Sequence, residues 1–177
     1  MKGLTLALGL LVALCTLCAQ AKPVIKPDIK PNKVAGTWFG LAVASDSILA
    51  RIRYWAVYTS DLDFTDNGNL VVKTTFPKIG RCEKESKIYT KTDTPGRYNS
   101  EASGSELEFM TAYDQKIVVM VKSNRGPISG FILSLLGRTM NLPPEDYEIF
   151  KQLALDVGAN VDDVFPLPQL GLCGAPD

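Results

Sequence analysis

Short extended segments separated by tight turns fill the middle of this 177-residue chain. The turn Thr65-Asp66-Asn67-Gly68-Asn69 contains Asn-Gly, a pair favoured in tight hairpins, between residues 62–64 and 70–76. Other segments rich in apolar or alternating residues are 36–44, 52–60, 87–90, 97–101, 106–112, 116–122 and 128–136. Strand-like segments about 8 to 12 residues apart predict an all-β barrel or sandwich. Hairpins without long crossovers favour an antiparallel up-and-down barrel.

The spacing of apolar residues changes near the C-terminus. After Pro143-Pro144-Glu145-Asp146, apolar side chains recur three or four residues apart at Tyr147, Ile149, Phe150, Leu153, Ala154 and Val157. Prolines and acids suit the first turn of a helix, and Gly158 suits its end. We therefore predict one amphipathic C-terminal α-helix packed outside the barrel. One more short strand is expected within residues 161–167.

The N-terminus has the composition of a secretory signal. Lys2 precedes an apolar run over residues 4–17, and Ala19-Gln20-Ala21 supplies small residues at a cleavage site after Ala21. The run is shorter than the ~20 residues that span a bilayer, so residues 1–21 are predicted to be a signal peptide and not a membrane span. Regularly spaced prolines predict an extended arm over residues 22–33. Residues 34–177 are then one secreted domain.

The charge balance and the absence of histidine restrict the possible functions. The chain has 19 basic and 19 acidic residues, which does not suggest a nucleic-acid partner or an anionic membrane partner. With no histidine, Ser-His-Asp and Cys-His nucleophiles and imidazole zinc sites are excluded. Catalysis by carboxylate, lysine or tyrosine side chains is not excluded. We expect no metal and no cofactor.

Two of the four cysteines lie in the domain. Cys15 and Cys18 belong to the predicted signal peptide, which leaves Cys82 and Cys173. In an oxidising compartment such an isolated pair most simply forms one disulfide. Closing so long a loop would restrict the unfolded chain by about 4 to 5 kcal/mol and would attach the C-terminal tail to the barrel.

Three short motifs resemble those of the lipocalin family, in the same order along the chain. They are Gly36-Thr37-Trp38, Thr111-Ala112-Tyr113 and Leu136-Gly137-Arg138. The resemblance implies an eight-stranded antiparallel barrel closed at one end, where Arg138 stacks on Trp38. Gly36, Trp38, Thr111, Tyr113 and Arg138 would then be structural residues. The family usually has Thr-Asp-Tyr in the second motif; here Ala112 replaces the acid, and Asp114 is a candidate substitute.

The resemblance also implies a function, namely secreted binding and transport of a small hydrophobic ligand. Fatty acids, retinoids, steroids and odorants are the expected classes, in an apolar interior without reacting groups. If Trp38 faces inward, alternation places Gly40, Ala42 and Ala44 inward too. The candidate ligand contacts are Trp38, Ala42, Tyr54, Tyr58, Val72, Phe109, Ile117, Val119 and Val121. We expect a monomer, and a cell-surface receptor stays open as a second partner.

One alternative is an enzyme. The sequence looks nearest to the lipocalin branch that contains prostaglandin D synthase. This resemblance implies that isomerase activity would need the thiolate of a cysteine on the second strand. The matching position lies within residues 58–60, and no cysteine occurs between Arg51 and Arg81. Hydroxyl groups do not replace a thiolate without an activating base. We therefore predict a protein that is not an enzyme.

A second alternative is a defensive protein that captures a charged siderophore. Such a ligand requires cations that face into the barrel. Arg53, Lys73, Lys116 and Lys122 are available by residue type. The direction in which these four side chains point decides between this alternative and a carrier of hydrophobic ligands.

Overall fold

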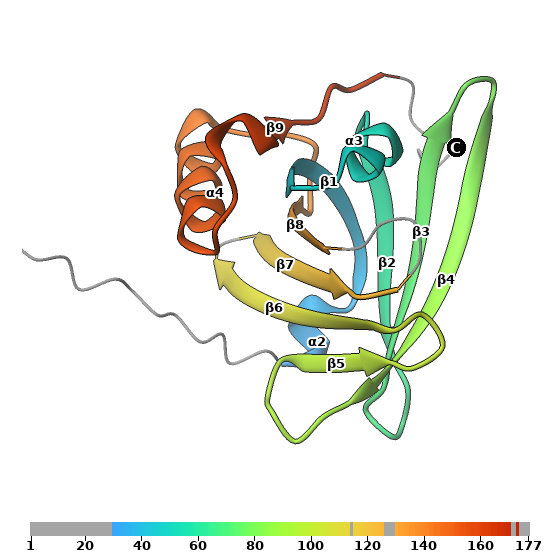
Figure 1. Cartoon of the computed structure of the whole chain (residues 1–177). Coiled ribbons are helices and arrows are strands. Elements are labelled where there is room, and N and C mark those ends of the chain that lie inside the picture. The colour runs from blue at the N-terminus through green and yellow to red at the C-terminus, as the bar shows by residue number, and fades with distance from the viewer. Residues whose placement is uncertain (1–29, 114, 126–129, 171–172, 174–177) are drawn as a thin grey trace, which may run out of the picture.

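The computed structural model describes residues 30–113, 115–125, 130–170 and 173 (Figure 1). The predicted signal peptide, residues 22–29 of the predicted arm, and Asp114 lie outside the described residues. Among the residues that the structure describes, no helix has the length and apolar character needed to cross a bilayer.

Eight antiparallel strands close into a barrel, as the sequence predicts. The barrel strands are β1 (Gly36–Ser45), β2 (Tyr58–Phe64), β3 (Leu70–Lys78), β4 (Arg81–Lys91), β5 (Arg97–Ser100), β6 (Ser105–Tyr113), β7 (Lys116–Ser123) and β8 (Gly130–Gly137), and β9 (Val164–Pro166) is a short additional strand. Each of β2 to β8 pairs with its neighbour in sequence, and β1 pairs with both β2 and β8. This last pairing closes the barrel and leaves no open edge between β8 and β2. The added strand β9 pairs with β1 at Ala42–Ala44.

Within the described residues, three helices and one 3-10 turn, η1, accompany the barrel. They are α2 (Pro31–Val34), α3 (Ile48–Arg53), α4 (Pro144–Asp156) and η1 (Val161–Asp163). Helix α4 packs outside the barrel against β1 and β9, which confirms the predicted C-terminal helix (Figure 1). The prediction of an extended arm is wrong for the end of the arm that the structure describes, because Pro31–Val34 form one helical turn. Proline at the first helical position favours this turn.

The strand predicted over residues 52–60 is wrong in its first half. Helix α3 includes residues 52 and 53, and β2 begins only at Tyr58. Contacts between distant parts of the chain hold this segment, since Arg51 bridges to Asp163 and the Trp55 indole donates to the Pro77 carbonyl at 2.8 Å. These contacts override the strand preference of the local sequence.

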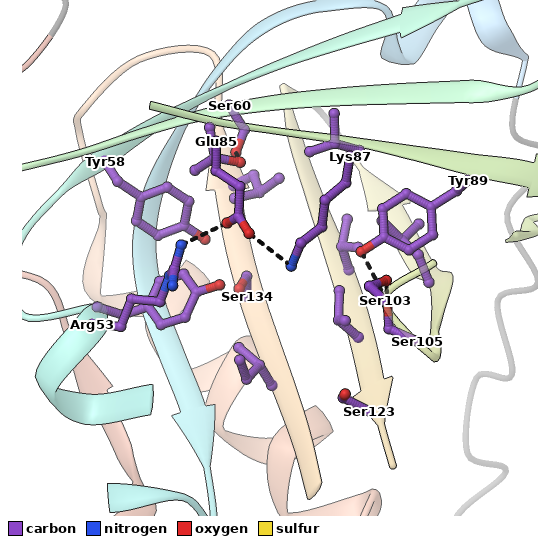
Figure 2. Close-up of a pocket in the computed structure, with 18 of the residues that line it drawn as sticks. Arg53, Tyr58, Ser60, Glu85, Lys87, Tyr89, Ser103, Ser105, Ser123 and Ser134 are labelled. Carbon is purple, nitrogen blue, oxygen red and sulfur yellow. Dashed lines mark hydrogen bonds and ion pairs between the residues drawn. The ribbon is translucent and has the colours of Figure 1, made fainter. Parts of the chain in front are cut away.

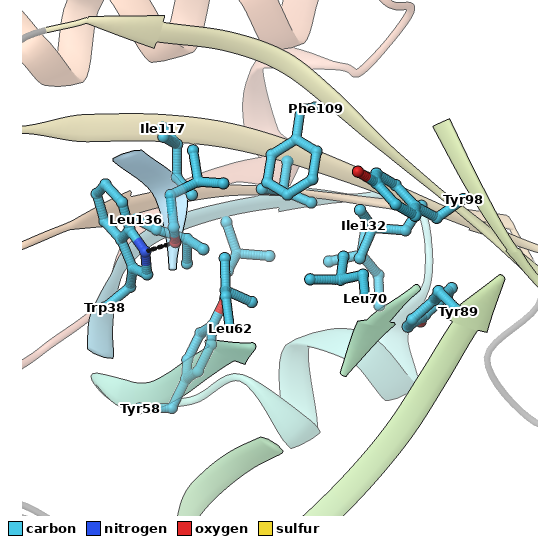
Figure 3. Packing of buried hydrophobic residues seen from close by; sticks show 14 of the residues in the cluster. Trp38, Tyr58, Leu62, Leu70, Tyr89, Tyr98, Phe109, Ile117, Ile132 and Leu136 are labelled. Carbon is cyan, nitrogen blue, oxygen red and sulfur yellow. Dashed lines mark hydrogen bonds between the residues drawn. The ribbon is translucent and has the colours of Figure 1, made fainter. Parts of the chain in front are cut away.

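Two hydrophobic clusters lie on opposite faces of the barrel wall. The inner cluster extends along the inside of the barrel and includes the closed end, where Trp38, Ile117 and Leu136 lie together (Figure 3). The outer cluster lies between the sheet and α4. It contains Ala42, Ala44, Val118, Met120, Leu133, Leu135, Phe150 and Ala154. Alternating residues of β7 and β8 therefore serve both clusters.

A bulge in β1 changes which face its alanines occupy. The register with β8 shifts between Gly40 and Ala42, so that Leu41 is an extra residue in the strand. An extra residue moves every following side chain to the other face. The predicted ligand contact at Ala42 is therefore wrong: Ala42 packs beneath α4 with Ala44, while Val43 faces inward.

The closed end is held by one guanidinium group, as the resemblance implies. The Cζ atom of Arg138 lies 3.8 Å from the centroid of the Trp38 ring. The same group donates hydrogen bonds to the carbonyls of Thr37 (2.9 Å), Lys33 (3.0 Å) and Ala35 (2.7 Å). The Trp38 indole donates to the Val34 carbonyl at 2.8 Å. Arg138 thus fixes the N-terminal turn to the base of the barrel.

The second motif lies beside α4. Thr111 is buried and Ala112 is exposed. The Tyr113 hydroxyl is buried and has no hydrogen-bond partner among the described residues. Burial, together with the Asp146 carboxylate, raises the pKa of Tyr113 to about 12. Asp146 itself forms an ion pair with Lys116 at 2.7 Å, which joins α4 to β7.

The predicted disulfide is also present, since Cys82 is bonded to Cys173.

Candidate ligand-binding site

A cavity of about 260 Å³ lies inside the barrel (Figure 2). Side chains from β2, β3, β4, β6, β7 and β8 line it, together with Arg53 and Tyr54. Its apolar lining residues are Leu62, Val72, Phe76, Leu107, Phe109, Val119, Val121, Ile132 and Leu136. This volume and lining suit one small molecule with a hydrocarbon part.

Three aromatic rings form one wall of the cavity. The Tyr54 and Tyr58 ring centroids are 5.1 Å apart, and Phe76 lies 5.2 Å from Tyr54 and 5.5 Å from Tyr58. Gly40 makes room for this group, because a Cβ atom at that position would lie 2.1 Å from the Tyr58 ring. Burial raises the pKa of Tyr58 to about 12, an effect that a hydrogen bond with Ser134 partly offsets. Tyr58 is therefore a neutral hydroxyl group inside the barrel.

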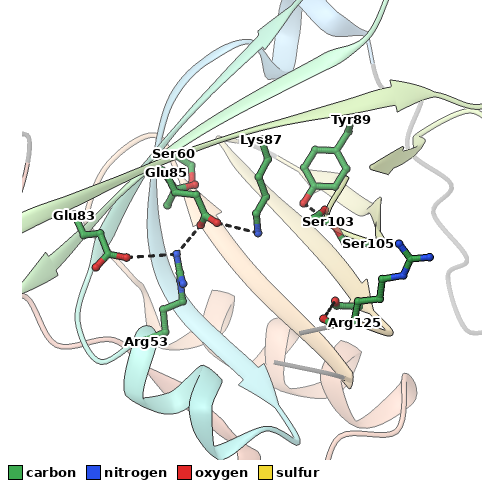
Figure 4. Close-up of polar contacts among 11 residues, drawn as sticks. Arg53, Ser60, Glu83, Glu85, Lys87, Tyr89, Ser103, Ser105 and Arg125 are labelled. Atoms are coloured by element: carbon green, nitrogen blue, oxygen red, sulfur yellow. Dashed lines mark hydrogen bonds and ion pairs between the residues drawn. The ribbon is translucent and has the colours of Figure 1, made fainter. Parts of the chain in front are cut away.

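A row of charged side chains crosses the cavity toward α3 (Figure 4). Arg53 Nη2 lies 2.6 Å from Glu85 Oε2 and 3.8 Å from Glu83 Oε1. Glu85 Oε1 in turn lies 3.3 Å from Lys87 Nζ. The guanidinium group of Arg53 also lies over the Phe76 ring, at 4.5 Å from its centroid. Arg53 therefore fixes α3 to β4 beside the cavity.

Cations outnumber acids in the cavity lining. Arg53, Lys87 and Arg125 line it, and Glu85 is the one carboxylate in the described lining. Arg53 and Lys87 share Glu85, while Arg125 has no ion-pair partner within the described ranges. The site can therefore accept a negative group from a ligand without first losing all of its own ion pairs.

Hydroxyl groups form the other polar part of the lining. Ser60 and Thr74 lie 3.2 Å apart, on neighbouring strands β2 and β3. Ser103 and Ser105 lie 2.5 Å apart, and Ser105 donates to the Tyr89 hydroxyl at 3.5 Å. The interior is therefore mixed in character, whereas the resemblance implied an apolar one.

Most of the predicted contacts do face the cavity. Tyr54, Tyr58, Val72, Phe109, Val119 and Val121 line it. Trp38 and Ile117 belong to the inner cluster at the closed end but are not part of the lining.

The four cations proposed for a siderophore are not brought together. Only Arg53 among them lines the cavity. Lys73 pairs with Asp63 on the exposed face of β3, and Lys116 pairs with Asp146 beneath α4. Lys122 lies beside a shallow surface depression near Asn99 and Glu106.

Sequence reasoning missed Glu85, Lys87 and the serines of the cavity. A signal for the charged residues is present in β4, where Glu83, Glu85, Lys87 and Tyr89 occupy every second position. Every second side chain of a strand faces the same way, so this pattern predicts a polar inward face once the strand is known to begin at Arg81.

Comparisons with known proteins agree with the barrel and its motifs. The model of the lipocalin / cytosolic fatty-acid binding protein family matches residues 35–170. A lipocalin from Rhinella marina is 36% identical over 180 residues, which cover 98% of each chain. Prostaglandin-H2 D-isomerase from Canis lupus familiaris is 30% identical over 179 residues, covering 97% of this chain and 93% of the relative. Among solved structures, the siderocalin Ex-FABP has a TM-score of 0.71 at 24% identity, covering 80% of this chain and 99% of that one, which shows a shared fold. Because the family model spans most of the chain and the Rhinella marina relative is similar along nearly its whole length, this chain belongs to the lipocalin family.

Proposed function

We propose that this protein is a secreted carrier that binds one fatty acid inside its barrel. Lipocalins bind small hydrophobic ligands, so the open question is the ligand class. The observation that carries the proposal is the excess of cations over acids in the lining of a cavity that also has an apolar wall. A neutral retinoid, steroid or odorant would add no partner for Arg125 and would leave Arg53 and Lys87 to share Glu85, whereas a carboxylate would give these cations a second acid.

The hydrocarbon chain supplies most of the binding energy in this proposal. Each Å² of apolar surface that leaves water contributes roughly 25 cal/mol. The chain would pack against Leu107, Phe109 and Val119, with the carboxylate near Lys87. Secretion is supported by the signal-like residues 1–21 and by the disulfide, since disulfides persist in oxidising compartments.

Matched acid and alcohol ligands test the proposed carboxylate site. Delipidated protein is titrated calorimetrically with dodecanoate and with dodecanol, which have equal chains and different head groups. We expect one molecule of dodecanoate per protein and at least tenfold weaker binding of dodecanol. Lys87→Gln is expected to weaken dodecanoate binding about fivefold, because a partly exposed ion pair contributes about 1 kcal/mol. Binding of dodecanol should not change in this variant.

The control is Lys73→Gln, because Lys73 lies on the same sheet but faces solvent, with 59% of its side chain exposed. This variant should bind dodecanoate like the wild type. If dodecanol binds as tightly as dodecanoate, the ligand is not an acid. If neither ligand binds, the carrier proposal itself is wrong.

We further propose that the protein has no prostaglandin-H2 isomerase activity. The Canis lupus familiaris relative is named as that isomerase. By the resemblance, the position of the family's cysteine lies within Tyr58–Ser60, where this chain has no cysteine. Ser60 lines the cavity and its hydroxyl contacts only Thr74 at hydrogen-bond distance among the described residues. This contact supplies no base to activate a nucleophile. Incubation with prostaglandin H2 should give no prostaglandin D2 above the spontaneous rate.

A siderophore-binding role is supported less well. The solved structure of Ex-FABP is that of a siderocalin, but its likeness to this chain is one of fold. Of the four cations expected for that role only Arg53 lines the cavity. Lys87 and Arg125 line it too, but Glu85 adds a negative charge between Arg53 and Lys87. Such a carboxylate opposes binding of a highly anionic complex.

A further inference from the structure

Buried hydroxyl groups occur at two levels inside the barrel, and the first of them borders the charged row, because Thr74 is paired with Glu85 on β4. Ser60 and Thr74 form one pair, and Tyr58 with Ser134 forms the second. Ser60, Tyr58 and Ser134 are each at least nine-tenths buried, at 5%, 4% and 9% exposure. All four residues line the cavity, and Figure 2 shows Tyr58, Ser60 and Ser134 around the same space as Lys87 and Glu85.

The strand register places the first pair near the closed end. Ser60 on β2 is directly opposite Trp38 on β1, and Thr74 on β3 is opposite Ser60. Tyr58 is opposite Gly40, one step further from the base. On β8, Ser134 lies between Ile132 and Leu136, which are apolar lining residues on the same face. The second pair is therefore set among hydrocarbon side chains, whereas the first pair borders Glu85.

Each pair keeps unused hydrogen-bonding capacity. A hydroxyl group offers one donor and two acceptor positions, so a mutual bond between two hydroxyls leaves one donor and three acceptor positions. An alkyl chain packed against these groups would leave that capacity unmet, at a cost in binding. A ligand oxygen placed there would satisfy it.

We propose that the cargo is an oxygenated fatty acid, which carries a hydroxyl or carbonyl group on its chain in addition to its carboxylate. The Ser60–Thr74 and Tyr58–Ser134 pairs receive this second oxygen, while the cations near Lys87 receive the first. The inference rests on the proposed function, because it assumes that an acid enters the barrel with its chain toward the closed end.

Two acids of equal chain length test this inference, dodecanoate and 12-hydroxydodecanoate. In a purely apolar interior, burying an unpaired hydroxyl would weaken binding about tenfold or more. We expect the opposite: the hydroxy acid binds the wild-type protein at least as tightly as dodecanoate. Calorimetric titration of the delipidated protein measures both affinities.

Two variants locate the effect. Ser60→Ala combined with Thr74→Val, and separately Ser134→Ala, replace the hydroxyls with apolar groups of similar size. At least one of them should weaken binding of the hydroxy acid about tenfold more than it changes binding of dodecanoate. The control is Thr75→Val, a neighbouring threonine that is not in the cavity lining. Near-ultraviolet circular dichroism checks that each variant is folded.

The outcomes separate the two proposals. If wild-type protein binds dodecanoate at least tenfold more tightly than the hydroxy acid, the inference is wrong and the carrier proposal stands. The same conclusion follows if neither variant changes the ratio of the two affinities. If the wild type binds neither acid, the proposed function fails as well.

Discussion

Replacing both Cys82 and Cys173 with serine is expected to lower the free energy of unfolding by about 4 to 5 kcal/mol. The bond joins residues 91 positions apart, so its loss frees a long loop in the unfolded chain. In the folded protein it ties the tail to the start of β4. Equilibrium unfolding in urea, followed by tryptophan fluorescence, measures the difference between the two proteins.

Reduction of the wild-type protein provides the control. Under reducing conditions the wild type and the double variant should unfold at the same urea concentration, since neither then has the bond. The tail keeps other anchors, because the Val57 N–H donates to the Pro168 carbonyl at 3.0 Å, the Leu167 N–H donates to the Leu41 carbonyl at 2.8 Å and the Gln169 side chain donates to the Met140 carbonyl at 2.9 Å. A loss below about 1 kcal/mol would mean that these anchors alone hold the tail, and the loop-entropy argument would be wrong.

Arg138→Ala is expected to cost about 2 to 3 kcal/mol of stability. The substitution removes the contact with the Trp38 ring, which is worth about 0.5 to 2 kcal/mol. It also removes hydrogen bonds to three backbone carbonyls in and just after the N-terminal turn. A hydrogen bond from a charged group contributes about 1.5 to 3 kcal/mol, and water that takes the place of the guanidinium recovers part of this energy. The change is measured by urea unfolding.

Two further variants isolate the cause. Arg138→Lys keeps the charge but lacks the planar fork that reaches several carbonyls at once, so it should recover only part of the loss. Arg97→Ala removes the ion pair between Arg97 and Glu108, in which the arginine side chain is 43% exposed. This variant should lose less than about 1 kcal/mol of stability. If Arg138→Ala and Arg97→Ala have equal effects, the closed end does not depend on the guanidinium.

The barrel and its closed end could be predicted because their signals are local or carried by distinct motifs. The Asn67-Gly68 turn sets the β2–β3 hairpin, and Gly68 adopts the positive φ of 78° that such a turn favours. Alternation in residues 106–109 correctly places Leu107 and Phe109 inward. The Trp38–Arg138 contact joins residues 100 positions apart, and only the resemblance to a known family indicated it.

The predictions failed where one residue or one distant contact decides the outcome. The bulge at Leu41 reversed the direction of Ala42, and nothing in residues 36–44 marks that position. The segment around α3 contains strand-favouring residues, yet ion pairs of Arg51 and Arg53 with distant acids hold it as a helix. The polar part of the cavity was missed because the serines lie on different strands and no local pattern marks them. Only the pairing of the strands brings their hydroxyl groups to one cavity.

The proposed function requires that a single acid lie inside the barrel between the cations and the closed end. A crystal structure of the protein with dodecanoate tests this requirement. We expect one elongated ligand with its carboxylate about 3 Å from Lys87 Nζ and its chain against Leu107 and Val119. Ligand density on the outer surface, or a barrel filled by its own side chains, would contradict it.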